Sequence, residues 1–203
     1  MYVKQYKSKN IICGCDEAGR GALAGPVIAG AVILPKNFSH KKLNDSKKLS
    51  EKSRNEMANF IKNKSLFWSI GIANVSKIDK LNILNASIYA MHDAINKIIT
   101  KMTHPPELLL IDGNRFKAYK NIKHKCIIKG DAKYCSIAAA SIIAKTYRDQ
   151  LMIKLDQDYP HYNWKKNKGY PTKEHKKQIC KLGSTKHHRT SFKLFETQYT
   201  LPF

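Results

Sequence analysis

Acidic side chains are scarce in this chain, yet four of them stand where predicted strands end. The chain has 15 Asp and Glu residues against 37 Lys and Arg residues. Three separate segments end in acids at or just after an apolar run, and these acids are Asp16 with Glu17, Asp112, and Asp131. Ligands collect at strand ends in α/β sheets. We therefore expect the four carboxyl groups to meet at one edge of a sheet.

Four converging carboxylates would repel one another strongly unless a cation lay between them. Oxygen-rich sites favour Mg²⁺ or Mn²⁺ over zinc. Two such ions, about 3.5–4 Å apart, clamp a phosphodiester and promote its hydrolysis. The plainer interpretation is that these acids are ordinary strand-end and turn residues, since Asp-Gly, as at 112–113, is a common turn dipeptide. The residues alone leave both interpretations open.

Three residues that follow the first acid pair suit contact with a nucleic-acid backbone. Gly19 and Gly21 flank Arg20, and glycine lets the main chain approach a ligand closely.

Neighbouring residues of a regular strand point to opposite faces of the sheet. Asp16 and Glu17 can therefore reach one site only if the backbone turns there, which the glycines make feasible.

The elements that would position these residues follow from apolar patterning. Strands are predicted at 10–16, 25–34, 66–75, 107–113 and 124–129. Helices are predicted at 51–63, at 82–101 after a short helix that begins beyond Ser76, at 135–158 and at 173–182. The first three strands suggest an antiparallel meander, and the later alternation of strands and helices implies parallel pairing. The predicted class is α/β with a mixed sheet, and the small residues 138–141 suit close packing on that sheet.

Length and composition predict one domain over residues 1–203, with a core at about 10–158 and a small C-terminal appendage at about 159–203. No apolar run approaches the roughly 18 residues of a membrane span. The N-terminal residues have no signal-peptide pattern, so the default expectation is a cytoplasmic protein. The five cysteines form no C-x-x-C pair, which favours reduced thiols.

The net charge of +22 suggests a polyanionic partner, nucleic acid above all. However, only five of the 37 cationic residues are arginines. Lys, Ile and Asn share A/T-rich codons, so part of this charge is open to explanation by genome composition.

Eight motifs together resemble one family. They are Gly-Cys-Asp-Glu-Ala-Gly-Arg-Gly at 14–21, Leu-Asn-Asp-Ser-Lys-Lys-Leu-Ser at 43–50, Leu-Asn-Ile-Leu-Asn-Ala-Ser at 81–87, Ile-Asp-Gly-Asn at 111–114, Lys-Gly-Asp-Ala-Lys at 129–133, Ala-Ala-Ser-Ile-Ile-Ala-Lys at 139–145, Lys-Gly-Tyr-Pro-Thr at 168–172 and His-His-Arg-Thr-Ser-Phe at 187–192. In this order they look like bacterial ribonuclease HII, a type 2 ribonuclease H. Nearly the whole chain is covered.

This resemblance implies a ribonuclease H-like mixed sheet flanked by helices, with a small helical C-terminal region. It implies a two-metal endonuclease, using Mg²⁺ or Mn²⁺, that cleaves RNA in RNA–DNA hybrids. It also implies cleavage 5′ of a single ribonucleotide in duplex DNA, leaving 3′-hydroxyl and 5′-phosphate ends. Members often have serine where this chain has Ala138, which puts the support of Asp131 in question.

The site residues that the resemblance implies fall into three groups. The catalytic and metal-binding acids are Asp16, Glu17, Asp112 and Asp131. The residues that would recognise the ribonucleotide and its neighbour are Gly19, Arg20, Gly21 and Tyr170. Lysines that we expect at phosphates are Lys47, Lys48, Lys145 and Lys168.

Two other functions compete with this one. A non-catalytic basic nucleic-acid-binding module would not need the four acids. A metal-dependent DNA exonuclease would not need Gly19-Arg20-Gly21 and Tyr170. We expect a monomer with no membrane contact. Residues 198–203 only faintly resemble a sliding-clamp-binding peptide, and without a paired aromatic end we expect no clamp contact. His187 and His188 are open to two interpretations, as nucleic-acid contacts or as surface residues.

Overall fold

A single five-stranded sheet organises the chain. The computed structural model describes residues 3–41, 43 and 49–192. Its strands are β1 (Ile12–Ala18), β2 (Val27–Ile33), β3 (Phe67–Ala73), β4 (Leu108–Asp112) and β5 (Lys123–Ile127), in the order β3-β2-β1-β4-β5. Strands β1, β2 and β3 pair antiparallel, whereas β4 pairs parallel with both β1 and β5. The predicted meander, mixed sheet and α/β class are confirmed.

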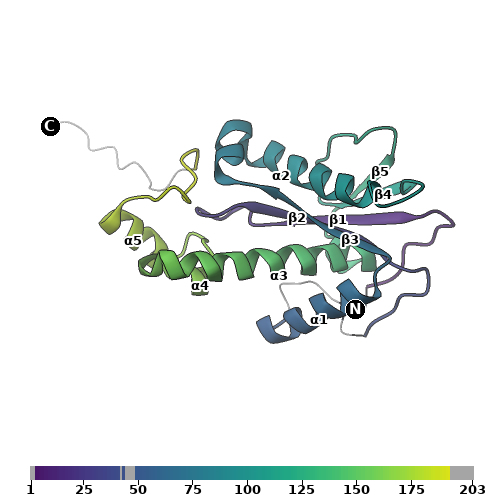
Figure 1. The fold of residues 1–203 in the computed structure, drawn as a ribbon, viewed down its shortest axis with the longest axis horizontal. Helices are drawn as coiled ribbons and strands as arrows, with labels where there is room; N and C mark the ends of the chain where they lie inside the picture. The colour runs from purple at the N-terminus through teal and green to yellow at the C-terminus, as the bar shows by residue number, and fades with distance from the viewer. Residues whose placement is uncertain (1–2, 42, 44–48, 193–203) are drawn as a thin grey trace.

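Helices cover both faces of the sheet. They are α1 (Glu51–Lys64), α2 (Val75–Ile99), α3 (Cys135–Asp158), α4 (Trp164–Asn167) and α5 (Lys173–Leu182), with 3₁₀ turns η1 (Gly130–Ala132) and η2 (Pro160–Tyr162). Figure 1 shows α2 on one face, with α3 and α1 on the other. The predicted bounds of α3 and α5 match the observed ones, and those of α1 differ by one residue.

Helix α2 contains a break that reconciles two predicted helices with one observed element. Asn82 has a φ of 63° and a ψ of 165° inside the helix. Its side-chain oxygen accepts a hydrogen bond from the backbone N–H of Asn85 at 3.1 Å, as an N-cap residue does. The short helix beyond Ser76 and the long helix from 82 are therefore successive parts of α2.

Helix α3 lies directly on the two central strands. A Cβ atom at Gly14 would be 2.3 Å from the carbonyl carbon of Ser136, and one at Gly30 would be 2.4 Å from the carbonyl oxygen of Ala140. Such distances are far below van der Waals contact, so a side chain at either position would push the helix away from the sheet. The predicted packing of the small residues 138–141 on the sheet is confirmed, and it brings α3 close to the acids of β1.

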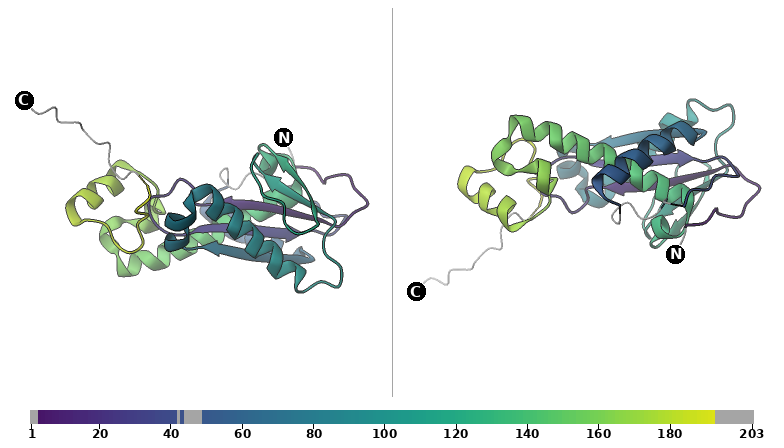
Figure 2. Two further views of the ribbon diagram at one scale, coloured as in Figure 1. Left: turned by 90° about the horizontal axis from the view of Figure 1, so that it is seen from above. Right: turned by 90° about the horizontal axis from the view of Figure 1, so that it is seen from below.

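The C-terminal elements gather at one end of the sheet. Figure 1 shows α5 beyond the C-terminal end of α3, with α4 beside that end, and the yellow-green segments gather at the same end of the molecule in Figure 2. They share an apolar cluster with the segment after β1, and its buried members are Leu23, Ala24, Met152, Tyr162, Trp164 and Ile179. Thr172 caps α5 by accepting a hydrogen bond from the backbone N–H of His175 at 3.1 Å, and Gly183, with a φ of +80°, ends the helix. This packing places residues 168–170 next to residues 19–25.

No helix among the described residues has the length and apolar character needed to cross a bilayer.

Candidate active site

The first two acids lie inside β1 rather than beyond its end. We expected the strand to stop at residue 16, but β1 continues to Ala18. The chain turns at Gly19, where φ is +96°. Asp16 and Glu17 nevertheless line the same cavity, together with Asp112 at the end of β4. The parallel pairing of β1 with β4 brings these strand ends together, which is the arrangement that the sequence predicts.

This cavity has a volume of about 460 Å³ and is built from residues far apart in the sequence. Its lining is Asp16, Glu17, Ala18, Gly19, Arg20, Gly21, Asp112, Ser141, Lys145 and Tyr170. Eight of the twelve expected site residues are in this set. Of the other four, Lys47 and Lys48 lie outside the described residues, and Asp131 and Lys168 are not part of the lining.

Asp131 lies on turn η1 and is not among the residues that line the cavity. Its side chain is buried, with the residue 7% exposed. The charge of Asp131 makes the smallest contribution to the raised pKa of Asp16, after burial, Glu17 and Asp112. Asp112 connects β4 to the same turn, because its Oδ1 accepts a hydrogen bond from the backbone N–H of Gly130 at 2.7 Å. The fourth acid is therefore held beside the other three.

The electrostatics of the acids favour a bound cation. Burial raises the pKa of Asp16 well above its usual range, and the charges of Glu17 and Asp112 raise it further. Burial also raises the pKa of Glu17, although Arg20 opposes this through an ion pair of 3.1 Å. A divalent cation would relieve both the desolvation and the repulsion.

The donor set consists of carboxylate oxygens, which fit Mg²⁺ or Mn²⁺. In the described part of the chain, no three His, Cys, Asp or Glu side chains already form a closed metal cluster. Asp16, Glu17 and Asp112 line one cavity, but direct coordination of one ion by three of these acids would require their side chains to move from these positions.

Two buried arginines hold the loop that follows β1. Arg148 of α3 donates hydrogen bonds to the carbonyl oxygens of Pro26 at 3.0 Å and Ala24 at 3.0 Å. Arg189 donates to the carbonyl oxygens of Gly19 at 2.7 Å, Arg20 at 2.9 Å and Gly25 at 2.8 Å. Both arginines are 0% exposed. The carbonyl groups of this loop are therefore fixed by guanidinium groups on its inner side.

Burial lowers the pKa of Arg189 to about 9, which leaves it cationic at neutral pH. Neither arginine was among the expected site residues, although Arg189 lies in the motif 187–192. The available signal was compositional, because arginine is rare in a chain that uses lysine almost everywhere. Planar, multiple donation to carbonyl groups is something that lysine cannot reproduce.

The two glycines of this loop differ in what the fold demands of them. A Cβ atom on Gly19 would lie 2.0 Å from Nε of Arg148, and its φ is also positive. A Cβ atom on Gly21 would meet no atom within 4 Å, and its φ lies outside the left-handed region. The fold therefore requires glycine at position 19 but not at position 21. Gly21 borders the cavity, so its lack of a side chain keeps the main chain accessible there.

Tyr170 faces the same cavity from the C-terminal region. Its ring lies 5.2 Å from the guanidinium carbon of Arg148 and 5.4 Å from Nζ of Lys145. Distances of this size allow cation–π attraction to orient the ring. The backbone of Leu23 donates a hydrogen bond to the carbonyl oxygen of Gly169 at 2.8 Å, which fixes the tyrosine segment to the glycine loop.

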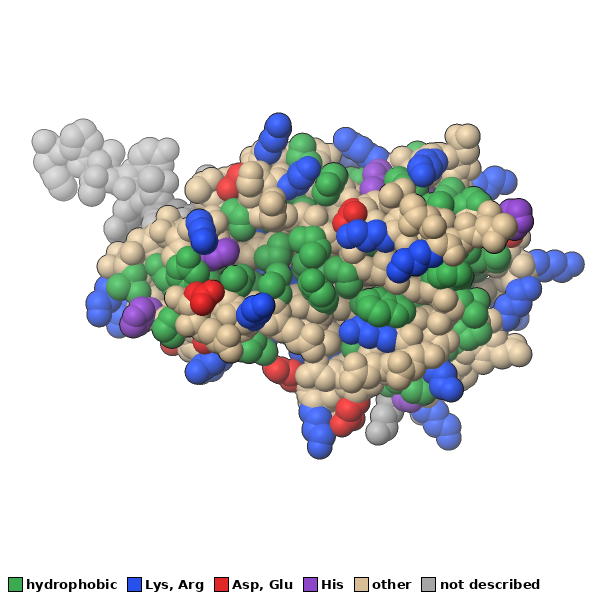
Figure 3. Space-filling view, in the orientation of Figure 1, with side chains coloured by type: hydrophobic (Ala, Val, Ile, Leu, Met, Phe, Trp, Pro, Cys, Tyr) green, Lys and Arg blue, Asp and Glu red, His purple; other side chains and the backbone are tan. Residues whose placement is uncertain are grey.

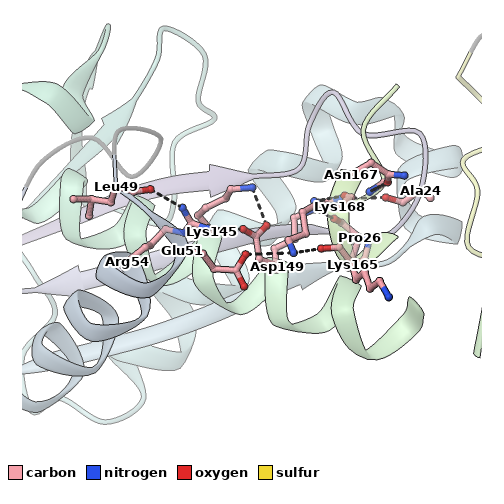
Figure 4. A network of polar contacts seen from close by, with 12 residues as sticks. Ala24, Pro26, Leu49, Glu51, Arg54, Lys145, Asp149, Lys165, Asn167 and Lys168 are labelled. Carbon is pink, nitrogen blue, oxygen red and sulfur yellow. Dashed lines mark hydrogen bonds and ion pairs between the residues drawn. The ribbon is translucent and has the colours of Figure 1, made fainter. Parts of the chain in front are cut away.

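The two described lysines of the expected site have different surroundings, as Figure 4 shows. Nζ of Lys145 is 2.8 Å from Oδ1 of Asp149, and the other carboxylate oxygen of Asp149, Oδ2, is 2.8 Å from Arg54. Lys145 lines the cavity. Lys168 is 8% exposed, and its Nζ binds the carbonyl oxygen of Lys165 and lies 3.6 Å from Glu51. The structure brings Lys145 to the cavity, whereas Lys168 is occupied inside the protein.

The histidine pair is not an exposed surface feature. His188 is 1% exposed, and His187 is partly buried against the rings of Tyr159 and Trp164. The interpretation of His188 as a nucleic-acid contact or a surface residue is therefore wrong. It is an interior residue, because the helices of the C-terminal region enclose it.

Sequence comparisons match nearly the whole of this chain to known proteins. The family model described as ribonuclease HII matches residues 13–195. A protein named ribonuclease HII from Christiangramia forsetii is 53% identical over 98% of this chain and 98% of its own length. Another of the same name from Bacteroides fragilis is 56% identical over 91% of this chain and 90% of its own.

Solved structures with similar folds are more distant in sequence. Ribonuclease H2 from Pyrococcus horikoshii has a TM-score of 0.75 at 22% identity, covering 90% of this chain and 94% of its own. The ribonuclease HII of a PCNA complex from Archaeoglobus fulgidus has a TM-score of 0.73 at 23% identity, covering 93% and 98%. Bst-RNase HIII in complex with Mn²⁺ has a TM-score of 0.71 at 17% identity, covering 91% and 68%. These likenesses support the ribonuclease H-like fold.

Proposed function

The chain belongs to the ribonuclease HII family, and we propose that it cleaves duplex DNA on the 5′ side of a single embedded ribonucleotide. As a member of this family it is a ribonuclease H, a metal-dependent endonuclease for RNA–DNA hybrids. The observation that carries the finer proposal is the shared cavity. The cavity is lined both by the carboxylates Asp16, Glu17 and Asp112 and by the recognition residues Gly19, Arg20, Gly21 and Tyr170.

The carboxylates are proposed to hold two divalent ions, either Mg²⁺ or Mn²⁺. Asp16, Glu17 and Asp112 would be direct ligands, and Asp131 would bind more loosely or orient water. When bound, such ions activate water and stabilise the leaving oxygen of a phosphodiester. In the overall reaction, the water oxygen joins phosphorus and the bond from phosphorus to the 3′ oxygen breaks. That oxygen takes up a proton, which leaves a 3′-hydroxyl and a 5′-phosphate.

Selection of the ribonucleotide is proposed to depend on exposed main chain. A lone ribonucleotide differs from its neighbours by one 2′-hydroxyl. The backbone at Gly21 has no side chain and no neighbouring atom over it, so a ribose can approach its polar groups. The flat ring of Tyr170 suits the next sugar, provided that this sugar is a deoxyribose without a second hydroxyl.

Cations around the cavity would hold the phosphates. Arg20 is half exposed beside Glu17, and Lys145 lines the cavity. Phosphate contacts position a duplex without reading its sequence. Figure 3 shows Lys and Arg side chains scattered across the visible face of the molecule and around its edge.

We further propose that residues 1–203 act as one domain, as a monomer and in the cytoplasm. No clamp contact is proposed, and residues 198–203 lie outside the described residues.

The proposal is tested with three matched duplexes that contain one internal ribonucleotide, an all-RNA strand or DNA only, each with Mg²⁺ and with Mn²⁺. We expect cleavage of the first on the 5′ side of the ribonucleotide, cleavage of the second, and none of the third. A basic binding module would shift all three in a gel without cutting any. A DNA exonuclease would shorten the third from its ends.

A further inference from the structure

A buried chain of hydrogen bonds connects the C-terminal loop to the backbone of Tyr170. The backbone N–H of Thr185 donates to Nδ1 of His188 at 2.9 Å. Nε2 of His188 is 3.2 Å from Nε2 of His175. Nδ1 of His175 is 2.9 Å from the carbonyl oxygen of Tyr170. No step of the proposed reaction accounts for these two histidines.

The partners fix the tautomer of each ring. A carbonyl oxygen only accepts, so Nδ1 of His175 must carry a hydrogen. Nε2 of His175 accepts from Nε1–H of Trp164 at 3.0 Å. Nδ1 of His188 accepts from Thr185, so its Nε2 carries the hydrogen that it donates to His175. With both imidazoles neutral, the single lone pair on Nε2 of His175 is shared by two N–H donors, Nε1 of Trp164 and Nε2 of His188.

The surroundings of the pair disfavour protonation. His175 is 0% exposed and His188 is 1% exposed. Burial lowers the pKa of both, and for His188 the neighbouring His175 and His187 lower it further, to about 4. The groups packed against the pair are the rings of Tyr162 and Trp164 from the preceding helical turns, with His187 and the buried Arg189 adjoining in sequence. The acidic residue next to His175 in the sequence is Glu174, and its carboxylate accepts a hydrogen bond from the side chain of Asn163.

We propose that His175 and His188, both neutral, are positioning residues that set the place of Tyr170 in the cavity. This inference rests on the proposed role of Tyr170 against the sugar. His175 holds the tyrosine carbonyl, and His188 with Trp164 holds the ring of His175 in the one orientation that donates to it. A hydrogen on Nε2 of His175 would face two N–H donors. Protonation of this atom at acid pH would therefore break the series of hydrogen bonds.

The first experiment compares two substrates in every variant, a duplex with one ribonucleotide and an all-RNA–DNA hybrid. Both use the same carboxylates, so the ratio of their kcat/KM values cancels effects on the metal site. We expect Tyr170→Ala and His175→Leu each to lower this ratio by about tenfold, since small displacements in a site have effects of that order or larger. His188→Gln retains an amide donor and should keep most of the ratio. His187→Gln alters the adjoining histidine, which takes no part in this series of hydrogen bonds, and should leave the ratio of kcat/KM values unchanged.

The outcomes separate this inference from the function on which it rests. If Tyr170→Ala leaves the ratio unchanged, the proposed sugar contact is wrong. If Tyr170→Ala lowers it and a folded His175→Leu does not, the positioning role is wrong.

If His175→Leu fails to fold, a second measurement tests the hydrogen-bonded histidine pair. In a Trp68→Phe background, Trp164 is the remaining tryptophan of the chain, and its fluorescence reports the state of His175. We expect an acid transition well below pH 6.5 that moves in His188→Gln. A transition near pH 6.5 that His188→Gln does not shift would show that the two histidines are not coupled as neutral hydrogen-bond partners.

Discussion

At the scale of single residues, Asp16 shows why a folded protein keeps a carboxylate where it is costly. It is buried beside three other acids, and these neighbours add to the effect of burial on its pKa. Such a group destabilises the metal-free protein, because charge is being desolvated near like charge. The metal-binding role proposed for Asp16 accounts for a carboxylate in this costly position.

The substitution Asp16→Asn separates these two effects. We expect cleavage to fall by a factor on the order of 10³ or more, because a direct ligand is lost. Without divalent ions the variant should be at least as stable as the wild type, since a buried charge has been removed. Added Mg²⁺ should raise the unfolding midpoint of the wild type more than that of the variant. A variant that is fully active, or that gains the same stabilisation from Mg²⁺, would show that Asp16 is not a ligand.

His188 gives a pH dependence whose sign follows from its lowered pKa. The unfolded histidine has a pKa of about 6.5, and the folded one has a pKa of about 4. Between these values the unfolded state binds more protons, so acid favours unfolding. The stability contributed by neutral His188 is complete above pH 6.5, is lost as the pH falls toward 4, and changes no further below that.

Urea unfolding at several pH values, compared between wild type and His188→Gln, measures this term. The difference in unfolding free energy should change by at most about 3 kcal/mol between pH 7 and pH 4. A difference that stays constant with pH would mean that His188 titrates alike in both states.

At the scale of elements, the loop after β1 is shaped by Arg148 of α3 and by Arg189 of the segment after α5. Arg189 donates four hydrogen bonds to three carbonyl groups of this loop. The resemblance identified the loop as a recognition element, but the source of its rigidity was not predicted. Contacts separated by more than 160 residues leave no periodic signal, whereas strands and helices do.

Arg189→Lys is predicted to loosen this loop. A lysine has no planar fork and would leave carbonyl groups unsatisfied, so we expect the unfolding free energy to fall by about 2–4 kcal/mol. Arg115→Lys, at an exposed position, is the matched control and should be neutral. Equal stability of the two variants in urea unfolding would contradict the role assigned to Arg189.

At the scale of the whole molecule, most of the fold could be predicted from the sequence because each element carries a local pattern. All five predicted strands exist, and α3 has its predicted bounds. Two features could not be found this way. The extension of β1 to Ala18 was not predicted, because Asp16, Glu17 and Gly19 are residue types that usually indicate the end of a strand. The burial of His188 was missed because it depends on how α4 and α5 close around it.

The residues of the candidate site, like the fold, could be predicted from the sequence only in part. The motifs identified the residues of the cavity, including Tyr170, which lies more than 140 positions from the glycines. They also included Lys168, whose surroundings show it bound to the backbone and to Glu51 rather than facing the cavity. A motif identifies which residues belong together, but it does not specify which atoms remain available to a ligand.

The central claim is that this cavity presents bare main chain to a ribose, and Gly21→Ala tests it most directly. The fold has room for this methyl group and no positive φ to oppose it, so the unfolding midpoint should match the wild type. The kcat/KM for a duplex with one ribonucleotide should nevertheless fall by about tenfold to a hundredfold, because the methyl group displaces the sugar. A variant with the stability of the wild type and undiminished cleavage at the ribonucleotide would contradict the account.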